Sequence, residues 1–171
     1  FYDAHCHLSI VADNHLKIDL SPDEVDSISE IVSKIERQAG ETPSGNWIQG
    51  VRYDETKLAE QRHPTRWDLD EASSEHPILI LHSGIHQAVV NSKALEVAGW
   101  DEELPEFGSN EEFIEQDPKT GEPNGIIRED AKDAIIGGRN VEGIIPDPTR
   151  EEEQEALRQA CEKYNSFGIT S

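Results

Sequence analysis

The chain has 171 residues, and its 36 acidic side chains outnumber its 15 basic ones, which gives a formal net charge of −21. So acidic a chain, with no basic run, has little with which to neutralise phosphates, and this argues against nucleic acid as a partner. No apolar stretch approaches the roughly 18 to 20 residues that a membrane span needs, while the length is sufficient for a sizeable hydrophobic core.

The first third of the chain predicts one strand and one long helix. Residues 1–8 alternate in character, which predicts a short strand that ends in a loop. Ser21 and Glu24 have the spacing of a capping box, and apolar residues at helical spacing follow, so a helix is predicted from Ser21 to Gly40. The apolar residues of that helix are Val25, Ile28, Ile31, Val32 and Ile35.

Strands and helices alternate in the next segment. A strand is predicted at 47–51, and short helices at 55–61 and 67–73. The continuous apolar run 78–81 is typical of a strand that is covered on both faces.

The second half of the chain continues this alternation. A helix is predicted near Ala88, with Val89, Leu95 and Ala98 as core residues and Gly99 at its end. Residues 101–125 are acidic and rich in Pro, Gly and Asn, which indicates a loop, and 126–136 predict a strand end that leads into a helix.

The last predicted helix begins at a second capping box, Thr149 to Glu152, and ends at Gly168. Its predicted buried stripe consists of Leu157, Ala160, Cys161 and Tyr164. The complete pattern is typical of an α/β protein with a largely parallel or mixed sheet.

Two further features concern the context of the chain. It contains no methionine, and Gly168 to Ser171 has the pattern of a strand's first residues, so we interpret the sequence as a segment of a longer polypeptide. Cys6 and Cys161 are predicted to be free thiols in a reducing cytoplasm, with one long-range disulfide as the alternative.

The pattern with the clearest chemical meaning is the pair His5 and His7. On a strand, residues two apart point to the same side, so both imidazoles could bind one divalent metal ion. Two neighbouring histidines on an exposed loop, without a metal, are the alternative.

Six segments in the same order resemble one known family. They are Phe1–Leu8 (FYDAHCHL), Asn46–Glu55 (NWIQGVRYDE), Pro64–Asp70 (PTRWDLD), His82–Leu95 (HSGIHQAVVNSKAL), Gly121–Glu129 (GEPNGIIRE) and Gly168–Ser171 (GITS). Each is similar to a motif of amidohydrolase family 3 in the amidohydrolase superfamily, in the YtcJ-like branch that includes deformylases of N-substituted formamides. The ordered set covers nearly the whole chain.

The resemblance implies a metal-dependent hydrolase that acts on amides or other non-peptide carbon–nitrogen compounds. Members of the family have a (β/α)8 barrel, and in this branch an inserted α/β domain separates the first two barrel strands. On this chain, 1–8 would be the first barrel strand, 9–165 the inserted α/β domain and 166–171 the start of the second strand, so the barrel would be incomplete. One or two divalent ions, with zinc expected, would be the cofactor, and a small molecule the substrate.

The resemblance also implies roles for five residues. His5 and His7 match metal ligands, and Glu129 matches a carboxylate that can bridge the metals, although a solvated glutamate at a helix start is an equal alternative. His86 and Asn91 match positions near the substrate. A structural hydrogen bond for His86 and a helix cap for Asn91 are the alternatives.

The family's later metal-binding histidines and its terminal catalytic aspartate have no counterpart in the chain. We therefore assign no catalytic residue within this segment and expect the isolated chain to be inactive. Asp3 is predicted to support the first strand rather than bind metal. The remaining histidines, His15, His63, His76 and His82, are predicted to be surface or turn residues.

Two alternatives to a hydrolase fragment remain open. The segment could be a self-standing α/β module that binds a small ligand or a partner without catalysis. Copies of the chain could also associate to cover the surface that the missing barrel would occupy, although a charge of −21 on each copy opposes association at low salt.

Overall fold

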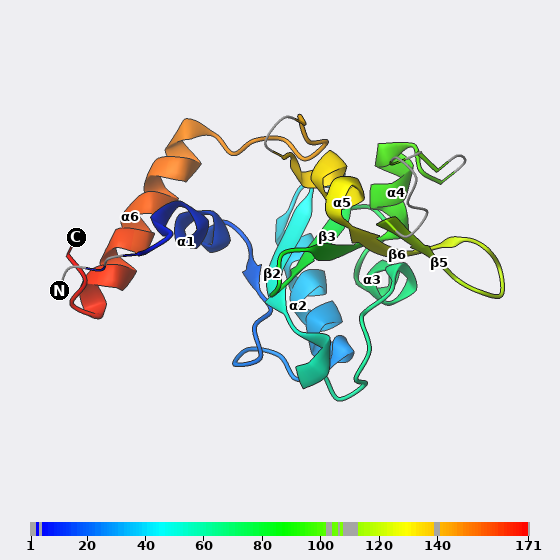
Figure 1. Ribbon diagram of the computed structural model, residues 1–171, viewed down its shortest axis with the longest axis horizontal. Coiled ribbons are helices and arrows are strands. Elements are labelled where there is room, and N and C mark those ends of the chain that lie inside the picture. The colour runs from blue at the N-terminus through cyan, green and yellow to red at the C-terminus, as the bar shows by residue number, and fades with distance from the viewer. Residues whose placement is uncertain are drawn as a thin grey trace.

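The computed structural model describes residues 3, 5–101, 104–105, 107, 113–138 and 141–170. Six strands form one sheet in the order β1-β2-β3-β4-β6-β5, with helices against both faces (Figure 1). The strands are β1 (Ile18–Asp19), β2 (Ile48–Tyr53), β3 (Ile78–His82), β4 (Gln87–Val90), β5 (Ile114–Gln116) and β6 (Pro123–Arg128). The helices are α1 (Leu8–His15), α2 (Ile28–Glu41), the short 3-10 helix η1 (Glu55–Lys57), α3 (Arg66–Ala72), α4 (Ser92–Ala98), α5 (Glu129–Ile136) and α6 (Arg150–Ser166). The predicted α/β class is confirmed.

Strand direction determines where the polar residues gather. Strands β1, β2 and β3 are parallel, whereas β4 is antiparallel to both β3 and β6. Strand β6 therefore runs in the same direction as β2 and β3, and the carboxyl ends of these three strands lie at one edge of the sheet. We call this the carboxyl edge. In open α/β sheets, ligands usually bind outside this edge.

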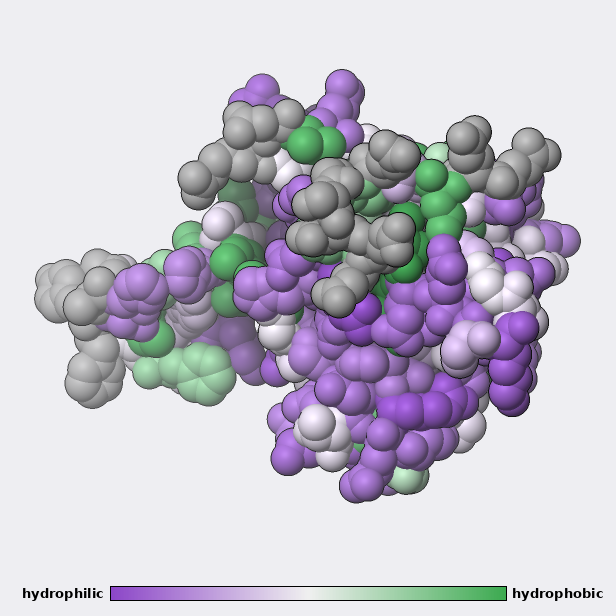
Figure 2. All heavy atoms as spheres, turned by 45° about the vertical axis from the view of Figure 1, so that its right-hand side comes forward, coloured by the Kyte–Doolittle hydropathy of each residue, from purple (hydrophilic) through white to green (hydrophobic). Residues whose placement is uncertain are grey.

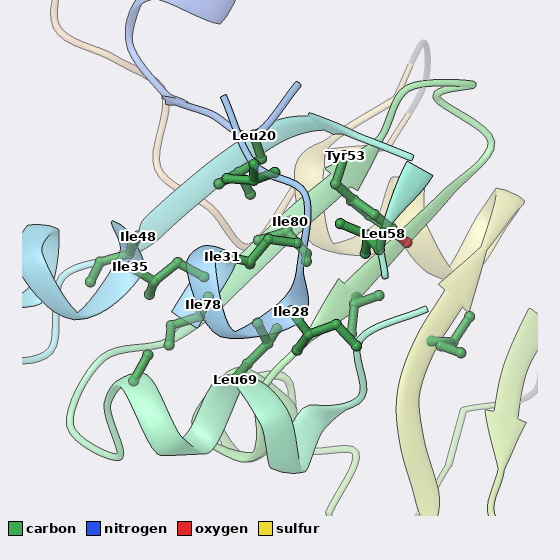
Figure 3. Close-up of a cluster of buried hydrophobic side chains, with 14 residues drawn as sticks. Leu20, Ile28, Ile31, Ile35, Ile48, Tyr53, Leu58, Leu69, Ile78 and Ile80 are labelled. Carbon is green, nitrogen blue, oxygen red and sulfur yellow. The ribbon is translucent and has the colours of Figure 1, made fainter. Parts of the chain in front are cut away.

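One face of the sheet packs against α2 and α3. Because side chains alternate along a strand, Ile78 and Ile80 of β3 point to this face, where they meet Ile31 of α2 and Leu69 of α3 (Figure 3). All four are fully buried.

The opposite face packs against α4 and α5. Leu79 of β3 and Ile127 of β6 point to this side, where they join Leu95 of α4 and Ile135 of α5 in a second cluster. Strand β3 is thus covered on both faces, as its continuous apolar run predicts.

Helices α1 and α6 form a pair that projects from the sheet (Figure 1). Small residues make their contact: Ala12 of α1 packs against Ala156 and Ala160 of α6. The face shown in Figure 2 is largely hydrophilic over the body that contains the sheet, whereas Ile10 and Phe167 of the α1–α6 pair are 50% and 63% exposed. Among the described residues, no helix is both long and apolar enough to cross a bilayer.

The start of α2 differs from the prediction. The Ser21 carbonyl accepts hydrogen bonds from the amides of Glu24 and Val25, which closes a turn rather than a helix. The helix begins after Ser27, whose side chain accepts from Glu30 N, and its first amide, on Ile28, donates to the distant Glu60 carboxylate. This long-range contact is not visible in the local pattern.

Most of the predicted apolar face of α2 is buried, but its end is shifted. Ile28, Ile31 and Ile35 are buried as predicted. Gly40 lies inside the helix, which continues to Glu41 and ends at Thr42, so the predicted stop at Gly40 is wrong.

The segment near Ala88 is a strand rather than the start of a helix. Residues 87–90 form β4, which is hydrogen-bonded to β3 on one side and to β6 on the other. The helix α4 begins only at Ser92, and Gly99 ends it with φ +71°. The predicted glycine stop is confirmed.

Two smaller predictions differ from the structure. The helix predicted at 55–61 is only η1, over Glu55–Lys57. In the segment 1–8, residues 1, 2 and 4 lie outside the described residues, Asp3 and His5–His7 do not form a strand, and Leu8 already belongs to α1.

Helix α6 begins as predicted but buries a different stripe. Thr149 and Glu152 form the predicted capping box. The buried residues are Ala156 and Ala160, whereas Leu157 and Cys161 are exposed. The sequence pattern identified the helix but not its contact face, because the partner α1 approaches along the alanines.

Candidate functional site

The first predicted metal ligands, His5 and His7, lie close together although they are not on a strand. Their Nε2 atoms are 3.0 Å apart, and the rings meet edge to face with centroids 4.8 Å apart. The Asp3 carboxylate accepts a hydrogen bond from His5 N, so it supports the backbone of this turn.

This geometry fits a metal ion. Around a tetrahedral zinc ion with Zn–N bonds of about 2.0–2.1 Å, two nitrogen ligands lie about 3.3 Å apart. The 3.0 Å separation of the two Nε2 atoms is close to that value. Both side chains are exposed and could complete a site with ligands from elsewhere.

The structure brings together two other predicted residues, His86 and Glu129. His86 precedes β4 and Glu129 follows β6, and because Gln87 pairs with Arg128 the two side chains meet at the carboxyl edge. His86 Nδ1 lies 3.1 Å from Glu129 Oε1, and Glu129 N donates to the His86 carbonyl. Glu129 is the first residue of α5, and its exposed side chain pairs with an imidazole. Its role as a metal ligand stays a prediction.

Asn91 is a structural residue in this fold. It is fully buried and caps α4, with its side-chain oxygen accepting from Ala94 N and Ile78 N. Its amide nitrogen donates to the carbonyls of Ser73 and His76. All four hydrogen-bonding positions of the amide are used, so the capping alternative is confirmed and the geometry gives substrate contact no support.

Residues that the sequence did not single out form a second group at the carboxyl edge. Asp54 and Glu55 follow β2, His82 ends β3, and His63 comes from the loop after η1; we call these four the acid–imidazole cluster. Glu55 Oε2 lies 2.7 Å from His82 Nε2 and 3.7 Å from His63 Nδ1. The prediction that His63 and His82 are ordinary surface or turn residues is therefore wrong.

A chain of hydrogen bonds fixes the orientation of His63. Arg128 Nε donates to Gln87 Oε1, so the Gln87 amide group points its NH2 toward His63 Nε2 at 3.2 Å. His63 Nε2 then accepts, which places the ring proton on Nδ1, 3.2 Å from the Tyr53 hydroxyl. A sequence signal for this contact was lacking, because Tyr53, His63 and Gln87 come from three separate segments.

Burial and neighbouring charges shift the pKa values of this group. Burial, and next the Glu55 charge, raise the pKa of Tyr53 far above its usual value, so its hydroxyl stays protonated. Burial lowers the pKa of His63; the Glu55 charge opposes this shift, and the charges of His82 and Arg128 reinforce it. His63 is therefore a neutral imidazole near pH 7.

The backbone is strained at three places on the same edge. Arg52 near the end of β2, Ile85 in the β3–β4 turn and Glu129 after β6 have φ values of +75°, +59° and +43°. Non-glycine residues seldom adopt such angles, and those that do tend to cluster at functional sites. These angles agree with the usual position of ligand sites outside the carboxyl edge.

The ion pair between Arg128 and Glu115 anchors this network and gives a pH-dependent prediction. Although burial opposes it, hydrogen bonds from Arg128 and Asn124 lower the pKa of Glu115. Its contribution to stability is therefore present above about pH 4.5 and is lost as the pH falls through its folded pKa. Because the pair is partly exposed, we expect Glu115→Gln to lower the free energy of unfolding by about 1 kcal/mol or less at pH 7. Urea unfolding from pH 7 to 3 checks this, and a difference from wild type that grows on acidification would contradict it.

His76 is another histidine that the sequence placed wrongly at the surface. It is 5% exposed, and its ring contacts Ser73 Oγ at 2.8 Å and the Thr42 carbonyl at 3.1 Å. Its role is to join the segments that lead into β2 and β3.

Comparison with known proteins gives a consistent result for the whole chain. A model of the "Amidohydrolase family" matches residues 1–171. The N-substituted formamide deformylase of Arthrobacter pascens is 33% identical over 135 residues, which are 79% of this chain and 24% of that protein. The putative amidohydrolase YtcJ of Bacillus subtilis (strain 168) is 29% identical over 171 residues, or 99% of this chain and 30% of that protein. The chain thus spans about a quarter to a third of the length of these relatives.

Solved structures agree with the fold. An uncharacterised metal-dependent hydrolase from Pyrococcus furiosus is similar with a TM-score of 0.59 and 25% identity, over 100% of this chain and 30% of that one. The corresponding protein from Pyrococcus horikoshii OT3 gives the same TM-score of 0.59 at 24% identity, over 100% of this chain and 29% of that one.

Proposed function

Because the chain belongs to the amidohydrolase family, we propose that it is part of a metal-dependent hydrolase that cleaves non-peptide, amide-type carbon–nitrogen bonds of a small molecule. The observation that carries this proposal is the His5–His7 pair, whose Nε2 atoms approach to 3.0 Å in a chain that matches the family throughout. The name of the deformylase relative supports an amide-type substrate.

In the proposed enzyme, His5 and His7 hold a divalent ion, with zinc favoured by two imidazole ligands. Such an ion lowers the pKa of a bound water and polarises a carbonyl group. Two histidines are fewer than the three or four protein ligands of zinc sites, so the remaining ligands come from other parts of the enzyme. The isolated chain is accordingly expected to lack turnover.

At the carboxyl edge, the proposed role of His86 and Glu129 is to position a substrate. The pair is exposed and combines a hydrogen-bond donor with a carboxylate acceptor. These are the two functions needed to orient the C=O and N–H groups of an amide.

We further propose that the α1–α6 pair joins the α/β domain to a (β/α)8 barrel. The exposed apolar side chains of Ile10, Leu157 and Phe167 on this pair support a covering surface of that kind. A reducing cytoplasm is the proposed compartment, supported by the two free and exposed cysteines, Cys6 and Cys161.

The proposed activity can be tested with the full-length protein. We expect it to hydrolyse at least one member of a panel of N-formyl and N-acyl amines, to lose that activity on treatment with a chelator and to regain it with zinc. The variant His5→Gln/His7→Gln should be inactive at every zinc concentration, whereas His15→Gln, at an exposed position on α1, should behave as wild type. Activity that survives complete removal of metal would contradict the proposal.

A further inference from the structure

The acid–imidazole cluster contains atoms that could coordinate a metal ion and that lie outside the hydrogen-bond chain around His63. One ligand atom from each of Asp54, Glu55 and His82 lies within 4.8 Å of the other two. The set combines two carboxylates with one imidazole. Mixed oxygen and nitrogen ligands suit zinc and similar divalent transition ions better than calcium or magnesium, which prefer oxygen alone.

The contact between Glu55 and His82 is the most informative part of this geometry. Glu55 Oε2 and His82 Nε2 are both enclosed and lie 2.7 Å apart, within ion-pair distance, yet neither atom has a hydrogen-bond partner among the described residues. Buried polar atoms nearly always have a partner. Two potential metal ligands that lie side by side without a hydrogen bond between them could both be satisfied by one shared ion.

Asp54 is available as an anionic third ligand. The Thr56 hydroxyl and the Thr56 amide both donate hydrogen bonds to the Asp54 carboxylate and hold it in place. These bonds use Oδ1. Oδ2 remains for an ion, and the side chain is only partly buried, which leaves a path from solvent.

From this geometry we infer a divalent transition-metal site at the carboxyl edge, formed by Asp54, Glu55 and His82, that is separate from the His5–His7 pair. Asp54 and Glu55 follow β2 and His82 ends β3, whereas His5 and His7 precede α1 in the projecting pair. The two sites can therefore be emptied one at a time, and either can exist without the other.

Binding at this site requires a change of tautomer at His82. Gly84 N donates to His82 Nδ1, which places the ring proton of a neutral imidazole on Nε2. An ion on Nε2 shifts that proton to Nδ1 and breaks the bond from Gly84, which lies in an exposed turn that can adjust. The competing arrangement is a shared proton between Glu55 and His82 with no ion.

Titration calorimetry with zinc chloride distinguishes these arrangements. The experiment uses the 171-residue chain with His5→Gln/His7→Gln, so that the first pair cannot bind, and we expect one zinc ion per chain. Adding Glu55→Gln/His82→Asn to this background should weaken binding by at least ten-fold, since even loss of a supporting residue weakens metal sites by about 10–100-fold. The matched control is His15→Gln/Glu71→Gln, which removes one exposed histidine and one exposed carboxylate elsewhere and should not change the affinity.

Two further measurements check the coordination of the bound ion and allow for a variant that does not fold. Cobalt(II) bound to the His5→Gln/His7→Gln chain should show visible absorption bands of a four- or five-coordinate site with nitrogen and oxygen ligands. If Glu55→Gln/His82→Asn disturbs the fold by circular dichroism, Asp54→Asn takes its place, because it keeps the acceptor for Thr56 and should still weaken zinc binding about ten-fold. Absence of zinc binding once His5 and His7 are replaced would overturn the inference in favour of the shared proton. Equal affinity of the cluster variants and the control would overturn it in favour of adventitious surface binding.

Discussion

Asn91→Ala is expected to lower the free energy of unfolding by about 3 kcal/mol. The substitution removes the cap of α4, a loss of about 1 kcal/mol. It also removes the acceptor of the Ile78 amide at 2.9 Å and the donors to two carbonyls, and buried polar groups without partners each cost about 1–3 kcal/mol. Urea denaturation followed by circular dichroism measures the change.

Two controls separate the buried network from a general effect of losing an asparagine. Asn165→Ala changes an exposed side chain on α6 and should stay within about 0.5 kcal/mol of wild type. Asn91→Asp keeps the acceptor oxygen for the cap but replaces both donors with negative charge facing the Ser73 and His76 carbonyls, so it should also destabilise the fold. A loss below 1 kcal/mol for Asn91→Ala would show that water replaces the missing amide.

Gly125→Ala is expected to destabilise the protein by about 3 kcal/mol, through strain and overpacking together. Gly125 has φ +95°, and an added Cβ would lie 2.4 Å from the Val90 carbonyl oxygen and 2.8 Å from Arg66 N. Both of these atoms belong to the backbone, so neither can move away without disturbing β4 or the start of α3. Thermal and urea unfolding should show the same loss.

Gly40→Ala is the matched control and should stabilise the protein, whereas Gly125→Ala should destabilise it. Gly40 lies within α2, and an added Cβ would meet nothing within 4 Å. Alanine is the better helix former and reduces the freedom of the unfolded chain, so stability should rise by about 0.5–1 kcal/mol. If both alanine variants lost stability equally, the steric explanation for Gly125 would be wrong.

The parts of the fold that the sequence predicted correctly are those with a local cause. The capping box at Thr149 starts α6 because the two residues satisfy each other's backbone groups within one turn. The apolar run 78–81 became a strand covered on both faces, since no polar residue interrupts it. Helix α4 ends at Gly99 because glycine can adopt a positive φ without steric cost.

The parts that were missed depend on contacts between distant segments. A short run such as Ala88-Val89-Val90 fits a helix or a strand equally, and pairing with both β3 and β6 decides for the strand. At Ser21 the capping pattern is present, but the contact of Glu60 with the Ile28 amide favours a start six residues later, after Ser27.

The candidate site shows the same difference between local patterns and contacts of distant segments. His5 and His7 could be singled out because they are two residues apart, and His86 and Glu129 because they stand in motifs of a known family. His82 also stands in such a motif, but nothing in that segment points to Glu55, and His63 lies in none of the matching segments. Their relation to Glu55 exists only once β2 and β3 are parallel and the loop after η1 has folded back. Sequence patterns identify sites formed within one segment more readily than sites formed between strands.

The contact between α1 and α6 has a consequence for how such proteins can be rearranged. The end of α1 and the start of α6 border one cavity of about 770 Å³, where Leu16 and Glu152 are among the lining residues. A polypeptide therefore enters the sheet-containing body and leaves it at neighbouring points. A unit whose two ends lie close together can be inserted into another protein at a single site or deleted from it, because the backbone of the host then needs little rearrangement.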